Sequence, residues 1–117
     1  MTDQAVQTDP VHDFIASTVR DHEVVLFMKG TPDAPRCGFS SLSVQILDQM
    51  GASFVGVDVL QDESLRDGIK AFTDWPTIPQ LYVKGEFVGG SDIIREMFQA
   101  GELQALMVEK GVPLGEA

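Results

Sequence analysis

The feature that most constrains the fold is the uninterrupted apolar run Val24-Val25-Leu26-Phe27-Met28. Its length and its β-branched and aromatic residues are typical of a strand, and the lack of polar alternation indicates that both faces of that strand are covered. A helix pattern precedes the run: Asp9 and Pro10 suit the N-cap and N1 positions, and apolar residues then recur at helical spacing through Val19. We therefore expect a central strand packed between other elements.

The next elements alternate between helix and strand. After a loop over residues 30–36, the apolar residues from Phe39 to Met50 follow helical spacing, so a second helix begins at Cys37 and stops at Gly51. Residues 54–59 form another strand, and residues 65–72 form a short helix. This order predicts an α/β sheet with parallel pairing.

The last part of the chain predicts a hairpin and a helix. Residues 81–83 and 87–88 flank Lys84-Gly85, which suits a two-residue hairpin turn and makes the sheet mixed. Ser91 is a candidate N-cap for a last helix, which we expect to continue past Gly101 to Lys110.

Length and composition limit the organisation and the class of partner. The 117 residues, 44% of them hydrophobic, suit one globular domain over residues 1–117, with residues 1–8 as a flexible tail. No apolar run approaches the roughly 20 residues that span a bilayer, and the N-terminus resembles no secretory signal. A formal net charge of -10 disfavours nucleic acid and anionic membranes as partners. We expect a cytoplasmic protein whose thiol stays reduced.

The only cysteine, Cys37, opens the tetrapeptide Cys37-Gly38-Phe39-Ser40 at the start of the second predicted helix. A helix N-terminus favours a thiolate, and the cations of Arg36 and Lys29 are expected to lower the thiol pKa further. The alternative is a buried, inert cysteine, but such cysteines normally lie inside an apolar run. Since one thiol closes no intramolecular disulfide, Cys37 needs a partner molecule.

Two further motifs and one arginine suit a peptide-like ligand. In Thr77-Ile78-Pro79 the proline precedes a strand, where a cis bond in a tight turn would leave the preceding backbone free to pair with an extended ligand. In Gly89-Gly90-Ser91-Asp92 the free N–H groups of a helix start suit a carboxylate. Taken singly, these motifs are also explained by an ordinary turn and a capped helix, and Arg66 by an ordinary surface position.

Together, the motifs resemble those of monothiol glutaredoxins of the CGFS, cluster-carrying type. The resemblance spans about residues 10–110 and rests on Lys29-Gly30-Thr31, Cys37-Gly38-Phe39-Ser40, Trp75-Pro76-Thr77-Ile78-Pro79-Gln80 and Gly89-Gly90-Ser91-Asp92. The stretch 32–36 before Cys37 is also similar to that type, since dithiol relatives have a shorter loop there. The resemblance implies a thioredoxin-like α/β fold, with a four-stranded mixed sheet flanked by about five helices.

The resemblance also implies glutathione as a ligand and a [2Fe–2S] cluster bridging a homodimer. Each protomer would give the cluster one Cys37 thiolate and one glutathione thiolate, which suits a chain with a single cysteine because such clusters take four sulfur ligands. Where many relatives carry a second cysteine this chain has Ser91, so a mechanism with an internal disulfide is excluded. The implied cofactor-binding residues are Lys29, Cys37, Gly38, Phe39, Arg66, Trp75, Thr77, Ile78, Pro79, Gly90, Ser91 and Asp92, with Pro76 helping to shape the groove.

Three functions follow as hypotheses. The first is cluster carriage in iron–sulfur transfer and iron homeostasis, with a scaffold as donor, apoproteins as acceptors and a BolA-like protein as partner. The second is a glutathione-dependent thiol–disulfide oxidoreductase that uses Cys37 to remove glutathione from mixed disulfides. The third is a regulatory adaptor that senses iron through cluster occupancy. Zinc and catalytic-triad chemistry are disfavoured, because His12 and His22 have no ligand set around them.

Overall fold

A mixed four-stranded sheet with strand order β4-β1-β5-β6 runs through the protein. The computed structural model describes residues 9–115, so the tail expected over residues 1–8 lies outside the described part. The apolar run is strand β1 (Val24–Met28), which is buried along its whole length. It pairs in parallel with β4 (Val55–Asp58) and antiparallel with β5 (Gln80–Val83), so it is a central strand as predicted.

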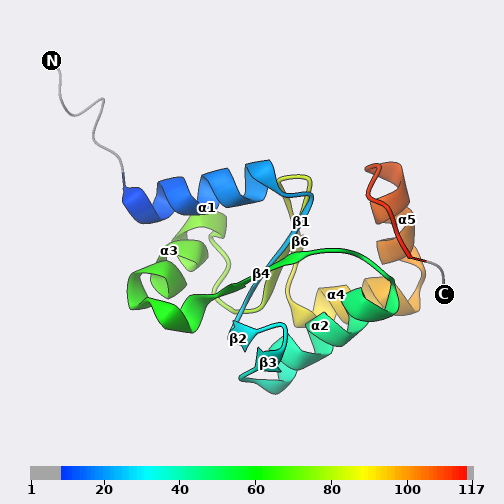
Figure 1. The fold of residues 1–117 in the computed structure, drawn as a ribbon, viewed down its shortest axis with the longest axis horizontal. Coiled ribbons are helices and arrows are strands. Elements are labelled where there is room, and N and C mark those ends of the chain that lie inside the picture. Colours follow the sequence, from blue (N-terminus) through cyan, green and yellow to red (C-terminus); the bar gives the residue numbers. More distant parts are fainter. Residues whose placement is uncertain (1–8, 116–117) are drawn as a thin grey trace, which may run out of the picture.

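Helices cover both faces of this sheet (Figure 1). Helices α1 (Pro10–Asp21) and α3 (Glu63–Thr73) lie on one face, and α2 (Gly38–Gln49) and α4 (Ser91–Gln99) on the other, where α5 (Glu102–Glu109) extends the layer. Successive side chains of β1 pack into two separate hydrophobic cores. Val25 and Phe27 lie in the core on the α1/α3 side, and Leu26 and Met28 in the core on the α2/α4 side. The predicted thioredoxin-like arrangement is confirmed.

The predicted hairpin is also present. Strand β5 is joined to β6 (Glu86–Gly89) by Lys84 and Gly85, whose φ angles of 53° and 81° are both positive. Positive φ at both turn positions belongs to the mirror-image turn whose twist matches that of the flanking strands. Two residues therefore suffice to reverse the chain, and β6 becomes an edge of the sheet.

The stretch 30–36 is more ordered than the predicted loop. It forms a small second sheet of β2 (Gly30–Thr31) and β3 (Ala34–Pro35). Gly30 has a φ of 91°, and a Cβ there would lie 2.5 Å from the carbonyl oxygen of Ala34, so glycine permits this tight return. The Asp58 carboxylate, at the end of β4, accepts a hydrogen bond from Gly30 N at 2.9 Å and ties this hairpin to the main sheet.

The last helix differs from the prediction in two ways. It does not continue past Gly101: Gly101 adopts a φ of 78°, which ends α4 and starts the separate helix α5. The N-cap of α4 is Gly90, not Ser91, because Ser91 is already the first helical residue. Gly90 has an extended backbone and makes no side-chain capping bond.

The strand predicted over residues 54–59 is shorter at both ends, as β4 covers Val55–Asp58 and a 3-10 helix follows at Val59–Gln61. The Asp58 side chain accepts from Leu60 N and so starts that turn. Over residues 9–115, none of the helices combines the length and apolar character of a membrane span.

Candidate functional site

Cys37 lies at the N-terminus of α2 as its N-cap residue, with an extended backbone (φ -150°, ψ 157°). Its Sγ accepts a hydrogen bond from the backbone N–H of Ser40 at 3.3 Å, where a serine or aspartate oxygen commonly serves. The Ser40 Oγ lies 3.3 Å from the same sulfur. The thiol is only partly buried, and it therefore remains open to a partner molecule.

The surroundings of Cys37 favour its thiolate. Burial raises the pKa of the thiol, but hydrogen bonds from the Ser40 hydroxyl and N–H, a bond from Phe39 N–H and the charge of Lys29 outweigh burial and lower the pKa below its ordinary 9.0. The predicted activation of Cys37 is thus supported, with hydrogen bonds ahead of charge. Arg36 is not among the causes of this shift. Its charge acts on Asp58 instead: burial raises the pKa of that carboxyl, but hydrogen bonds from Leu60 N, Gly30 N and Gln61, together with the charge of Arg36, lower it.

Ser40 connects the thiol to the end of β1. Its hydroxyl is fully buried and accepts a hydrogen bond from Lys29 N at 3.0 Å. That bond uses the oxygen as an acceptor and leaves the hydroxyl proton free to donate to the Cys37 sulfur. Arg36 N donates to Lys29 O at 2.8 Å, so both backbone groups of Lys29 are bound to the segment that carries Cys37.

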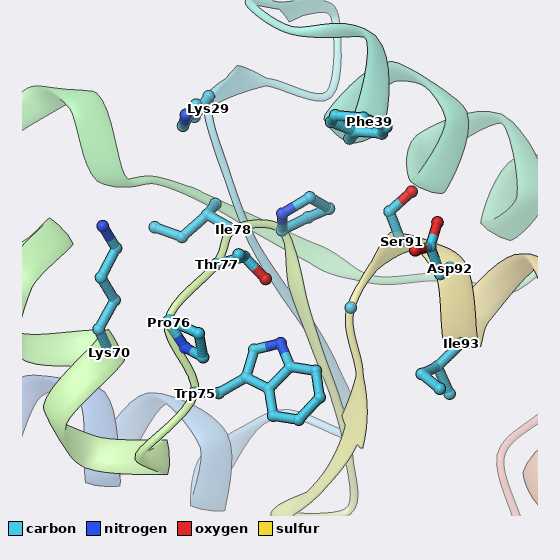
Figure 2. Close-up of a pocket in the computed structure, with 12 residues that line it drawn as sticks. Lys29, Phe39, Lys70, Trp75, Pro76, Thr77, Ile78, Ser91, Asp92 and Ile93 are labelled. Carbon is cyan, nitrogen blue, oxygen red and sulfur yellow. The ribbon is translucent and has the colours of Figure 1, made fainter.

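A pocket of about 460 Å³ opens beside this segment (Figure 2). Lys29 and Phe39 border it near the thiol, the strip from Trp75 to Pro79 crosses it, and the start of α4 closes the far side. Figure 2 shows Lys29 and Lys70 on one side of the strip and Ser91 and Asp92 on the other. The pocket therefore has cations at one end and a helix N-terminus at the other.

The strip connects α3 to β5, and its first three residues, Trp75 to Thr77, are exposed, whereas Ile78 and Pro79 are buried. Asp74, the residue before the strip, ends α3 in the left-handed conformation (φ 57°), and Trp75 N donates to Lys70 O. The Ile78–Pro79 peptide bond is cis, as predicted. Trp75 is 37% exposed, and its ring packs on Phe87 with ring centroids 5.5 Å apart, so it forms a wall of the pocket.

The start of α4 leaves polar groups available. The Ser91 hydroxyl oxygen is shielded from solvent yet has no hydrogen-bond partner within residues 9–115. A Cβ on Gly90 would lie 3.4 Å from both Pro79 O and Trp75 Nε1, so the absent side chain keeps this corner of the pocket open. Asp92 adds a carboxylate at the same edge.

Most of the predicted site residues come together in this pocket. Its lining contains nine of them: Lys29, Phe39, Trp75, Thr77, Ile78, Pro79, Gly90, Ser91 and Asp92. Cys37 and Gly38, the two residues before Phe39, lie outside the lining, and so does Arg66.

Sequence reasoning missed Lys70 and Ile93, both of which line the pocket. Lys70 lies one turn beyond Arg66 on α3, so spacing of four residues along that helix was a usable signal. Ile93 gives no such signal, because a partly exposed isoleucine early in an amphipathic helix looks like any other. Within the described part of the chain, no three His, Cys, Asp or Glu side chains lie close enough together to form a metal site.

Comparison with known proteins identifies the family. The glutaredoxin family profile matches residues 24–88. The probable monothiol glutaredoxin 2 of Rickettsia typhi is 50% identical over 83% of this chain and 87% of its own length. The mitochondrial monothiol glutaredoxin-S15 of Arabidopsis thaliana is 45% identical over 83% of this chain, which spans 57% of that relative.

A solved structure agrees with the sequence comparisons. The monomeric truncated mutant of Trypanosoma brucei 1-C-Grx1 superposes with a TM-score of 0.84 at 36% identity, over 94% of this chain and all of that one. The profile, the relatives and the fold coincide with a single thiol at the start of α2. The chain therefore belongs to the glutaredoxin family, among its monothiol members.

Proposed function

We propose that the protein binds glutathione in the pocket beside Cys37. The volume of this pocket, about 460 Å³, lies in the range typical of small-molecule sites. Lys29 both lines the pocket and acts on the pKa of Cys37, which links the binding site to the thiol. That link is the observation that carries the proposal.

The charges of the pocket suit the tripeptide. Lys29 and Lys70 would take the glycine carboxylate of glutathione, and the free N–H groups of α4 with the Ser91 hydroxyl would take the carboxylate of its γ-glutamyl end. Asp92 would pair with the glutathione ammonium. The backbone of the ligand would contact Thr77 and Ile78. The groove around it would be shaped by Pro79, Phe39, Trp75 and Gly90. Gly38 has no side chain and would let the ligand sulfur approach Cys37.

Arg66 remains a proposed contact on weaker grounds. It is half-buried on α3, outside the lining, and its Nε has no hydrogen-bond partner within residues 9–115. We expect Lys70→Ala to weaken glutathione binding at least about tenfold and Arg66→Ala to weaken it less, since a charge-assisted bond contributes about 1.5–3 kcal/mol. Calorimetric titration of both variants tests this order. An unchanged affinity in Lys70→Ala would remove the lysine from the ligand site.

We further propose that two protomers carry a [2Fe–2S] cluster as cargo, held by Cys37 and one glutathione thiolate from each. The chain suits this role because it has one partly exposed thiol that favours the thiolate, and a site for a second thiol beside it. A cluster needs four such sulfurs. Because half of them come from exchangeable glutathione, the cluster would be labile and suited to transfer from a scaffold to acceptor apoproteins.

Anaerobic reconstitution with iron, sulfide and glutathione tests this proposal. We expect a coloured dimer in gel filtration and visible absorbance, and its loss in Cys37→Ser or when glutathione is omitted. A cluster retained in either case would overturn the ligand assignment. Adding a BolA-like protein to the coloured dimer tests that proposed partnership, and a mixed complex on the same column is the expected result.

A thiolate-favouring Cys37 also supports the second function, removal of glutathione from protein mixed disulfides. The Cys37 thiolate would attack the glutathionyl sulfur and release the protein thiolate. A second glutathione thiolate would then attack the glutathionyl sulfur of the Cys37 disulfide, forming oxidised glutathione and releasing the Cys37 thiolate. A glutathione-coupled reduction assay separates the two functions. Fast turnover by the cluster-free protein would make the oxidoreductase role the main one.

The cellular compartment stays a prediction. We propose the cytoplasm, although the name of the Arabidopsis relative places that protein in mitochondria. Fractionation of cells with an antibody against the protein decides between the two compartments.

A further inference from the structure

Gln80 is a fully buried polar side chain at the start of β5, just after the strip that crosses the pocket. Its carboxamide donates to two carbonyls, accepts from the Tyr82 hydroxyl and lies near the Thr73 hydroxyl, whose one proton is shared with Ile69 O. Buried amides are costly unless they are paired, so a fully satisfied one marks a position with a specific role.

The donor half of this amide holds the pocket wall. Gln80 Nε2 donates to Trp75 O at 3.2 Å and to Thr77 O at 3.1 Å. Because carbonyl oxygens only accept, these two bonds fix which end of the amide is nitrogen. Trp75, Pro76 and Thr77 are otherwise exposed, so this pair of bonds anchors an exposed turn from beneath.

The acceptor half connects the same amide to the rest of the fold. Gln80 Oε1 lies 3.1 Å from the Thr73 hydroxyl, at the end of α3, and accepts from the Tyr82 hydroxyl at 3.3 Å. Tyr82 itself packs on Phe27 and Phe87, and Phe87 packs on Trp75. The turn is therefore held through one carboxamide to α3 and to the sheet.

We propose that Gln80 is a positioning residue of the binding pocket, which holds Trp75 and Thr77 in the place where the ligand meets them. The ligand part of this inference rests on the proposed binding of glutathione. The structural part does not, because the hydrogen bonds of Gln80 to Trp75, Thr77 and Tyr82 exist within the chain alone.

Trp75 is the only tryptophan of the chain, so its fluorescence reports on the strip directly. The first variant is Gln80→Met, which keeps the length of the side chain and removes all its hydrogen bonds. The second is Gln80→Glu, which keeps the shape and the acceptor but turns the donor into an oxygen facing two carbonyls. Gln80→Glu carries the test if Gln80→Met fails to fold.

Two controls separate positioning from general stability. Tyr82→Phe removes a bond to Oε1 and leaves both donors on the strip. Met107→Ala creates a cavity in the core on the opposite face of the sheet, and it loses stability without touching the strip. Acrylamide quenching of Trp75 is measured in the ligand-free proteins, and then glutathione affinity and the thiol pKa are measured.

We expect the Gln80 variants to raise the quenching constant by at least about twofold, because the strip opens locally, and both controls to stay near the wild type. Glutathione affinity should fall about tenfold in the Gln80 variants with the Cys37 pKa unchanged. Folded Gln80 variants with wild-type quenching, or an equal rise in Met107→Ala, would overturn the proposal. If the wild type fails to bind glutathione, the proposed function fails, while quenching still decides the role of Gln80.

Discussion

The N-termini of helices α2 and α4 both face the candidate site, but only α2 is capped by a side chain. At α2 the sulfur of Cys37 accepts from Ser40 N, so the helix start is capped by the side chain that does the chemistry. At α4 the N-cap is a glycine without a capping side chain, and the Ser91 hydroxyl has no partner in the described part of the chain. One helix start favours a thiolate, and the other has polar groups available for the carboxylate that we propose to bind there.

The largest effect is expected when the Cys37 sulfur, which caps α2, is removed. Cys37→Ala and Cys37→Ser should both abolish thiol exchange and cluster assembly. Their stabilities should differ: serine still caps α2, whereas alanine loses the cap and about 1 kcal/mol of unfolding free energy. Urea denaturation checks the difference, with activity as the common readout. Equal stabilities would show that the sulfur does not cap the helix.

Removing the Ser40 hydroxyl tests the link between the capped helix and the end of β1. Ser40→Ala leaves Lys29 N without its acceptor and should cost about 1–3 kcal/mol of unfolding free energy. It should also raise the Cys37 pKa, because a hydrogen bond that favours the thiolate is lost. Alkylation rate against pH measures the pKa. A thiol that titrates as in the wild type would refute the role given to Ser40.

The lowered pKa of Cys37 also makes the stability of the protein depend on pH. A thiol whose pKa is lower in the folded state contributes stability that is fully present above its unfolded pKa, near 9.0, and is lost as pH falls through the folded pKa. The unfolding free energy of the wild type relative to Cys37→Ser should therefore rise with pH over that interval. Parallel stability curves for the two proteins would contradict the lowered pKa.

Adding a methyl group at Gly90 tests whether the uncapped start of α4 binds the ligand. The φ of Gly90 is -93°, which alanine adopts freely, but the new Cβ would project toward Pro79 O and Trp75 Nε1. Gly90→Ala should therefore fold normally and lose about tenfold in glutathione affinity, since a ligand no longer approaches the backbone closely. Calorimetry and thermal unfolding measure the two effects. Undiminished binding would place the ligand elsewhere.

The smallest effect is expected from removing the hydroxyl of Ser91, the residue after Gly90. Ser91→Ala removes a group that bonds to no described residue, so the unfolding free energy should change by less than about 0.5 kcal/mol. Glutathione affinity should still fall by a few-fold, because a bond to the ligand is lost. A clear loss of stability would mean that the hydroxyl already has a partner within the protein.

The sequence predicted the features that depend on local pattern. The apolar run of β1, the Lys84-Gly85 turn and the Asp9–Pro10 helix start lie where spacing and turn chemistry place them. Two helix boundaries were wrong: Ser91 is the first residue of α4 and not its N-cap, and Gly101 divides the expected last helix in two. The break at Gly101 was missed because apolar spacing is nearly the same on either side of it, and the cap was misplaced because serine favours both the N-cap and the first turn, so residue type leaves the boundary open by one residue.

The sequence by itself determined that one thiol stands at a helix start among motifs for a peptide-like ligand, because each of these signals lies within a few neighbouring residues. Only the tertiary structure decided that Ser40 joins the thiol to Lys29, that Lys70 enters the pocket and that Gln80 holds its wall. These contacts depend on how α2 and α3 pack on the sheet. The orientation of packed elements is set by the whole core, and no local pattern encodes it.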